Sequence, residues 1–210
     1  MEIQETNTNS DNEQNEYIKF LKNPLSSYKE ILALKPEKNI YVLMFLGSAA
    51  NAIGKASSQN MCDRGNLMFV LLTAIFAGGL FGIVSYYIYA ALLRWTGKML
   101  KGTADTNKMT TVLAWGSIPI ILSLAFTFFE ILLTGDAIFK SYPDLSGGGQ
   151  LLVQIISYIN IGLLLWSISL MVVGISVAQN FSIGKSILNL FMPIIVIFIP
   201  LLLIIFLRGN

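Results

Sequence analysis

The stretch that decides the fold runs from Leu67 to Leu93 and reads LMFVLLTAIFAGGLFGIVSYYIYAALL, without one charged side chain. It is longer than the roughly 20 apolar residues that a helix needs to cross the hydrocarbon core of a bilayer. Inside lipid, every backbone N–H and C=O has to be paired within the segment, so an apolar run of this length has to be helical. The sequence therefore predicts a helical integral membrane protein.

The composition supports this prediction and excludes several kinds of chemistry. The chain has 210 residues, of which 54% are hydrophobic and 12% are charged, whereas soluble domains carry about 25% charged residues. Its net charge of +2 is too small to indicate a nucleic-acid partner. Histidine is absent and Cys62 is the one cysteine, so the commonest metal ligand and any cysteine cluster are excluded. We expect no metal and no cofactor.

Five membrane spans are predicted along the chain, at about residues 40–56, 67–93, 111–134, 151–178 and 186–207. The first span is the weakest, because it is short and contains Asn51 and Lys55. Three prolines inside the later spans should bend their helices, since neighbouring helices can satisfy the carbonyls that a proline frees; these are Pro119, Pro193 and Pro200.

A different pattern precedes the spans. Residues 1–16 are polar and acidic, which is typical of a disordered tail. Within residues 17–36, Asn23 and Pro24 favour a helix start, with an N-cap followed by proline at the first helical position, and Pro36 should end that helix. One face of it is apolar (Leu25, Tyr28, Ile31, Leu32) and lysines lie outside that face (Lys22, Lys29, Lys35). This amphipathic helix either lies at the lipid headgroups or docks on the bundle.

Lysine and arginine are distributed unequally about the predicted spans. With a cytoplasmic N-terminus, most of the 14 basic residues fall on the inner side: Lys19, Lys22, Lys29, Lys35, Lys38, Arg94, Lys98, Lys101, Lys108 and Lys185. The outer side keeps Lys55, Arg64, Lys140 and Arg208. Cytoplasmic loops are enriched in these residues, so the fold class is an all-α protein with five transmembrane helices, an N-terminal interfacial helix, an inner N-terminus and an outer C-terminus.

Strongly polar side chains inside spans are costly and are candidates for function by default. Glu130 lies one turn from the outer end of the third span, where Lys55 and Lys140 are the nearest expected cations. It is either a transport site or, as its position favours, a carboxylate close enough to the interface to reach water. The fourth span carries a polar strip, Gln154, Ser157 and Asn160. Such a strip lines an aqueous path or, more commonly, forms hydrogen bonds between helices.

Small residues recur at helical spacing in the first two spans, where they let helix backbones approach closely. They are Gly47 and Gly54 in the first span and Gly78 and Gly82 in the second. Packing inside the bundle is the favoured interpretation. A homodimer through the face of Gly78 and Gly82 is the alternative.

Arg94, Lys98 and Lys101 close the second span at positions i, i+4 and i+7. We call these three residues the basic rim. A cluster of this kind on the cytoplasmic side binds anionic headgroups or an acidic partner, or serves only as a topology signal. The sequence contains no nucleotide-binding glycine loop and no metalloprotease motif, and a Ser182–Lys185 pair is weakly specific. We therefore predict no catalytic residues and no enzyme.

The loop TGKMLKGTAD at residues 96–105 and the segment LAWGSIP at 113–119 resemble the inner loop and proline-containing third span of the Yip-domain family. The stretch from Trp166 to Gly174, with Phe181-Ser182 and Lys185-Ser186, is similar to that family's connection between its last two spans. The resemblance extends over about residues 17–207 and implies a five-span membrane protein.

Eukaryotic members of the family bind prenylated Rab GTPases and support vesicle budding. This chain lacks their Asp-Leu-x-Gly-Pro stretch and resembles the bacterial branch, which implies the bacterial cytoplasmic membrane and carries no GTPase-binding site over to this sequence. Our leading hypothesis is a non-enzymatic scaffold that organises lipids or a cytoplasmic protein partner, with homo-oligomers as a further expectation. The alternative is a small transporter or channel that uses Glu130 and the polar strip.

Overall fold

The computed structural model describes residues 16–34, 39–142 and 144–208, with side chains described up to residue 196. Every regular element in these ranges is a helix, so the predicted all-α class is confirmed. Most of the expected acidic tail lies outside the described residues, as do Pro36 and the neighbouring Lys35 and Lys38.

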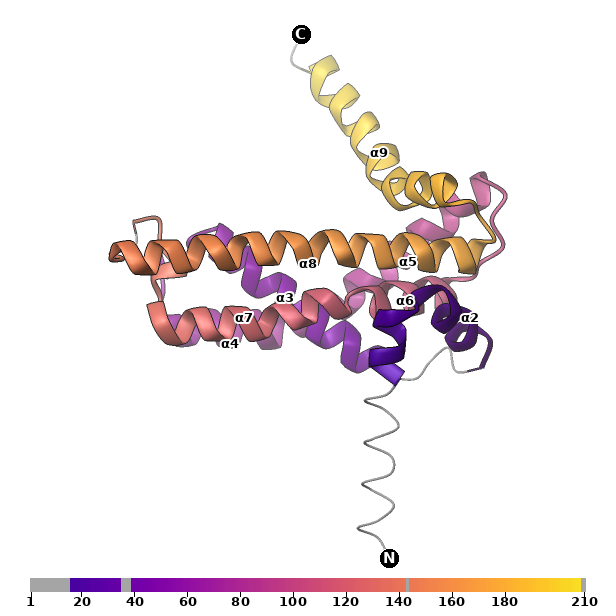
Figure 1. The fold of residues 1–210 in the computed structure, drawn as a ribbon. Coiled ribbons are helices and arrows are strands. Elements are labelled where there is room, and N and C mark those ends of the chain that lie inside the picture. Colours follow the sequence, from indigo (N-terminus) through magenta and orange to yellow (C-terminus); the bar gives the residue numbers. More distant parts are fainter. Residues whose placement is uncertain (1–15, 35–38, 143, 209–210) are drawn as a thin grey trace, which may run out of the picture.

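Four long helical segments lie side by side and form an elongated bundle (Figure 1). Each is long and apolar enough to cross a membrane. They are α3 (Ile40–Ser58); α4 (Leu67–Leu72), continued by the π-helical turn η2 (Thr73–Gly78) and by α5 (Gly79–Met99); α6 (Thr106–Gly116) followed by α7 (Ile118–Thr134); and α8 (Gly147–Gln179).

Helix α6 is the centre of the core. Every residue from Met109 to Ser117 is buried, as expected of a helix that packs against neighbours on all sides. Helix α6 ends just before Ser117, two residues ahead of Pro119, which has no N–H to donate to the preceding turn. The carbonyl of Gly116, at this break, accepts a hydrogen bond from Ser167 Oγ of α8 at 2.6 Å. A side chain of a neighbouring helix thus hydrogen-bonds to the backbone beside the break.

The N-terminal segment docks on the bundle through an aromatic cluster. Residues 16–22 form one helical stretch, and α2 (Pro24–Leu34) begins after a break at Asn23. Tyr28 is fully buried, and its hydroxyl donates to the carbonyl of Val112 on α6 at 3.1 Å. Phe20 packs against the rings of both Tyr28 and Trp115. Docking, one of the two alternatives left by the sequence, is therefore present, while Leu25 of the expected apolar face is 49% exposed.

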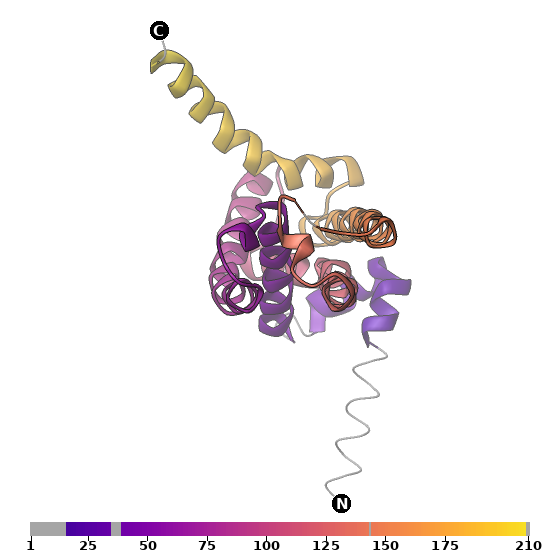
Figure 2. The same ribbon diagram turned by 90° about the vertical axis from the view of Figure 1, so that its left-hand side faces the viewer.

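Helix α9 (Ile183–Arg208) departs from the bundle. Its first part packs on α5 and α8, and its later part extends away from the four long segments (Figures 1 and 2). The fifth predicted span is therefore helical: α9 has 26 residues, and its first part, Ile183–Val196, is apolar.

The bundle has two ends with different connections. One end carries the loop between α5 and α6, the loop between α8 and α9, and α2 (Figure 1). The opposite end, which we call the α3–α4 end, carries the short helices η1 (Met61–Asp63) and η3 (Ala137–Phe139). There, Ser57 Oγ donates to the Ile138 carbonyl at 2.7 Å, and the hydroxyl of Ser141 donates to the Asp63 carboxylate at 2.5 Å.

Candidate functional site

The basic rim lies where α5 ends and the chain turns toward α6. Arg94 and Lys98 project from α5 and Lys101 from the loop that follows, and all three side chains are exposed. Arg94 Nη1 donates to Thr106 Oγ1 at 3.4 Å. Trp95, next to Arg94 in the chain, is 51% exposed. Cations beside an exposed indole are typical of a surface at the membrane–water interface.

A buried polar cluster lies beneath the rim, and we call Thr96, Gln179 and Asn189 the polar lock. Asn189 Nδ2, on α9, donates to Thr96 Oγ1 at 2.8 Å and to the Leu93 carbonyl at 3.1 Å. Thr96 Oγ1 in turn donates to the Leu92 carbonyl at 2.9 Å. Thr96 and Asn189 are both fully buried. The lock therefore ties the end of α5 to the start of α9.

Gln179, the last residue of α8, holds the loop that carries Lys101. Its Oε1 accepts a hydrogen bond from the backbone N–H of Ala104 at 3.0 Å, and the side chain is 1% exposed. Two glycines leave the space that this amide occupies: a side chain at Gly97 or Gly102 would collide with Gln179. The loop between these glycines is closed by a hydrogen bond from the Gly102 N–H to the Gly97 carbonyl at 2.8 Å.

Gln179 and Asn189 were not predicted to be functional residues. The signal was present, because both are amides set beside long apolar runs at the junction of two helices. It was not decisive, because Gln179 falls in a predicted loop and Asn189 lies within the first turn of the predicted fifth span, where an amide can equally well be solvated. Burial of these two side chains depends on how the α8–α9 loop packs against α5.

Glu130 does not meet the partners suggested for it. Its side chain is buried, at 6% exposure, and among the described residues no ion pair or hydrogen bond to its carboxylate is present. Lys140 pairs instead with Asp136, with Nζ and Oδ2 2.7 Å apart. Lys55 is exposed. Within the described part of the chain, this buried carboxylate therefore has no cationic partner.

The three residues of the polar strip take different directions. Gln154 and Ser157 are exposed, and Gln154 Nε2 lies 3.4 Å from the hydroxyl of Tyr158 on the same helix. Asn160 is half-buried and its Oδ1 has no hydrogen-bond partner among the described residues. Asn160 lines a cavity of about 320 Å³ whose other polar residues come from α3 and α7: Asn51, Lys55, Ser58, Ser123 and Thr127. The strip does not form a continuous wall.

Three of the four glycines singled out for helix packing lie against another helix of this chain. A side chain at Gly78 would collide with Ala52 of α3, and one at Gly82 would collide with Ser48. Gly47 faces the hydroxyls of Tyr86 and Ser117. Gly54 faces open space. The Gly78–Gly82 face is thus covered by α3 within one chain.

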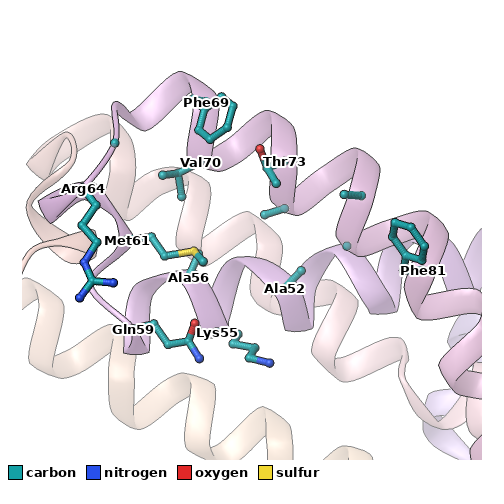
Figure 3. A pocket seen from close by; sticks show the side chains of 14 residues that line it. Ala52, Lys55, Ala56, Gln59, Met61, Arg64, Phe69, Val70, Thr73 and Phe81 are labelled. Carbon is teal, nitrogen blue, oxygen red and sulfur yellow. The ribbon is translucent and has the colours of Figure 1, made fainter.

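A second cavity, a groove of about 710 Å³, lies along one side of the contact between α3 and the α4–η2–α5 helix (Figure 3). Lys55, Gln59 and Arg64 lie at its α3–α4 end, and Phe69 and Phe81 lie along the α4–η2–α5 wall (Figure 3). The remaining lining is small or apolar: Ala52, Ala56, Met61, Gly65, Val70, Thr73, Ala74, Ala77 and Gly78. We call this cavity the α3–α5 groove.

Ser182 and Lys185 do not form a site. Both side chains are exposed, and the Lys185 ammonium lies over the ring of Phe181, 5.9 Å from its centroid. Ser182 accepts a hydrogen bond from Ser186 Oγ through its backbone carbonyl. The positions of these side chains give no support to a catalytic dyad.

Long apolar helices arranged around a buried central helix define a polytopic helical membrane protein. Within that class, the chain belongs to the Yip1 domain family, because the family model for the Yip1 domain matches residues 18–205. No curated protein and no solved structure matches the chain. The match includes the docked N-terminal helices as well as the bundle, so the expectation drawn from the resemblance is confirmed at the level of the family.

Proposed function

We propose that this chain is a non-enzymatic scaffold of the bacterial cytoplasmic membrane, which organises anionic lipid or an acidic protein partner through the basic rim. Its role would lie in membrane organisation or trafficking. The observation that carries this proposal is the rigid support of the rim. Its three exposed cations lie on the end of α5 and on the following loop, and hydrogen bonds of the buried polar lock fix the positions of both. A preorganised basic surface binds with less loss of conformational entropy than a flexible one.

The same proposal places the rim on the cytoplasmic side, with five spans, an inner N-terminus and an outer C-terminus. One observation and one general rule support it. The basic rim and the α8–α9 loop with Lys185 lie at the same end of the bundle as α2, which carries exposed Lys29. Juxtamembrane lysine and arginine are enriched on the cytoplasmic side, where each contributes about 1 kcal/mol of attraction to anionic lipid.

The experiment uses the full chain in phosphatidylcholine nanodiscs and asks whether it captures separate vesicles that contain phosphatidylglycerol. We expect capture by the unchanged protein, weakened by salt. The triple variant Arg94→Gln, Lys98→Gln, Lys101→Gln should lose about 3 kcal/mol of attraction, on the order of a 100-fold loss in affinity. A pull-down with the same pair of proteins tests the acidic-partner form of the proposal.

The matched control is Lys140→Gln, which removes a partly exposed cation from the opposite end of the bundle, outside the basic rim and outside the cavities described above. It should capture vesicles as well as the unchanged protein does. If the triple variant binds vesicles and partners normally, the basic rim is a topology signal alone and the scaffold proposal is wrong.

The cavity lined by Asn160 favours a second candidate function, the transport of a small polar solute. It brings polar side chains of α3, α7 and α8 together around one cavity, with Asn51, Lys55 and Ser58 exposed. Glu130 lies less than one helical turn beyond Thr127 of its lining and is buried, without an ion pair among the described residues. This candidate predicts a solute or ion flux in proteoliposomes that Glu130→Gln abolishes. The absence of flux with the unchanged protein would remove it.

A further inference from the structure

The α3–α5 groove has two chemically distinct halves. At one end it presents the ammonium of Lys55, the amide of Gln59 and the guanidinium of Arg64 (Figure 3). Beyond this end, the lining is apolar or small except for the hydroxyl of Thr73. These two halves match the two parts of an amphiphilic ligand, which has a polar head at one end and hydrocarbon along the rest. The volume of about 710 Å³ lies within the 300–1,000 Å³ range of small-molecule sites.

The charged end of the groove selects for an anion. No aspartate or glutamate is among the residues that line it. Within the described part of the chain, neither Lys55 nor Arg64 takes part in a salt bridge. Asp63, the carboxylate next to Arg64 in the chain, is engaged elsewhere: it accepts hydrogen bonds from the backbone N–H of Ser141 at 3.1 Å and from the hydroxyl of Ser141 at 2.5 Å.

The π-helical turn η2 forms part of the apolar wall. A π turn inserts an extra residue into a helix and is frequent at functional sites. Four of its six residues, Thr73, Ala74, Ala77 and Gly78, line the groove. Their small side chains leave the α3–α5 groove open. Where Gly78 contacts Ala52, the two walls of the groove meet.

The groove lies beside a surface that suits a lipid environment. The α4–η2–α5 segment is the least buried of the long helices, and several of its large apolar side chains are more than half exposed, among them Met68, Phe69, Phe76, Leu80 and Phe81. In a membrane this surface contacts acyl chains. An occupant that enters from this side comes from the lipid phase.

We propose that the α3–α5 groove binds one anionic phospholipid. Lys55 and Arg64 pair with its phosphate and Gln59 donates to a headgroup oxygen, while an acyl chain lies against Phe69, Ala77 and the other apolar residues of the wall. This site is separate from the basic rim, which lies at the opposite end of the bundle. It adds a lipid held within the plane of the membrane to the partner or vesicle that the rim would bind.

The test is native mass spectrometry of the full chain after exchange into micelles that contain phosphatidylglycerol and phosphatidylcholine in equal amounts. We expect one bound phosphatidylglycerol, retained at least about tenfold more than phosphatidylcholine. Lys55→Gln with Arg64→Gln should abolish this preference. Ala77→Trp, which fills the apolar part of the groove, should reduce the retention of both lipids. Circular dichroism and gel filtration verify that each variant is folded.

The matched control is Lys22→Gln with Lys29→Gln, which removes the same number of positive charges from exposed positions outside both the groove and the basic rim and should retain phosphatidylglycerol as the unchanged protein does. Equal retention of the two lipids by the unchanged protein would overturn the proposal, as would full retention by the Lys55–Arg64 double variant. Displacement of the lipid by inorganic phosphate, or a lipid-free dimer, would overturn it in favour of a free anion or a second copy of the chain. Vesicle capture tests the basic rim, and lipid retention tests the α3–α5 groove. A negative result in one assay therefore does not contradict the proposal for the other site.

Discussion

Asn189 of α9 donates a hydrogen bond from Nδ2 to the hydroxyl of Thr96 on α5 at 2.8 Å, and 93 residues separate the two in the chain. The same amide also donates to the Leu93 carbonyl. Because both side chains are fully buried, this pair fixes where α9 starts relative to the end of α5. The basic rim is built on that junction.

Replacing Asn189 with leucine should therefore weaken the junction. Interhelical hydrogen bonds in membrane proteins contribute about 0.6–2 kcal/mol each. Since Asn189 Oδ1 has no hydrogen-bond partner among the described residues, removing it offsets part of the loss, and we expect a decrease of about 1–2 kcal/mol in the free energy of unfolding. Unfolding in mixed micelles measures it. Leu188→Ala, at an exposed neighbouring position, is the control; a stability for Asn189→Leu equal to this control would contradict the role of the pair.

Gly97→Ala tests the close approach of Gln179 to α5. In an open helix, alanine is more favourable than glycine by about 1 kcal/mol. At Gly97, however, a Cβ atom would collide with the Gln179 amide, and overpacking costs about 1–3 kcal/mol. We expect Gly97→Ala to lower the melting temperature and to cost less when combined with Gln179→Ala.

The Gly97 and Gln179 variants form a double-mutant cycle. Its control is Gly54→Ala in α3, where nothing lies within 4 Å of the added Cβ atom. It should leave the melting temperature unchanged or raise it slightly. Additive effects of Gly97→Ala and Gln179→Ala would show that the two positions do not interact.

Tyr28 anchors α2, and its anchoring should fail at high pH. Burial raises the pKa of its phenol above the ordinary value of 10.0, because the charged form loses its hydration. The docked state therefore favours the neutral phenol. Its contribution to stability is complete below the unfolded pKa, about 10, and is lost progressively as pH rises above that value. Protease sensitivity of the α2 segment, followed from pH 8 to 11 in detergent, should increase at the upper end.

Two variants separate the phenol from the ring. Tyr28→Phe removes the hydrogen bond to Val112, should cost about 0.5–1.5 kcal/mol, and should remove this group's part of the alkaline transition. Tyr28→Ala leaves a cavity beside Phe20 and should release α2, at a cost of about 3–5 kcal/mol. A protease-resistant α2 in Tyr28→Ala would contradict the anchoring.

The proposed orientation predicts opposite labelling of two engineered cysteines. In a Cys62→Ser background, Tyr142→Cys lies on the α7–α8 loop at a position that is 94% exposed, and Lys101→Cys lies on the basic rim. A membrane-impermeant maleimide added to intact cells should label Tyr142→Cys and should label Lys101→Cys only after the cells are opened. The reverse pattern would place the rim outside.

Several elements could be predicted from the sequence because their causes are local. The break before Pro119 follows from its missing N–H, and the start of α2 at Pro24 follows from the fixed φ angle of proline. The helical stretch at residues 16–22, ahead of Asn23, and the π turn at Thr73–Gly78 were not predicted. The hydrophobic pattern is continuous across the π turn, so periodicity alone gives no signal for it.

The candidate sites divide in the same way. The exposed cations of the basic rim could be found, since charges that close an apolar run have to leave the hydrocarbon. Two features could not be predicted: that neither Lys55 nor Lys140 pairs with Glu130, and the direction in which the polar strip faces. Lys140 bonds to Asp136 four residues away, and Gln154 and Ser157 face outward, because the rotation of α8 is set by packing on α6 and α7. The α3–α5 groove requires two helices and has no signature in either one.

By itself, the sequence determined that this protein is helical and belongs in a membrane. The reason is that backbone hydrogen bonds in lipid must close within each segment, so apolar length dictates both properties without reference to the rest of the chain. Only the tertiary structure decided that α2 docks through Tyr28, that Gln179 and Asn189 are buried beneath the rim, and that Lys55 and Arg64 share one groove. Each of these depends on contacts between segments far apart in sequence, which exist only once the helices have packed.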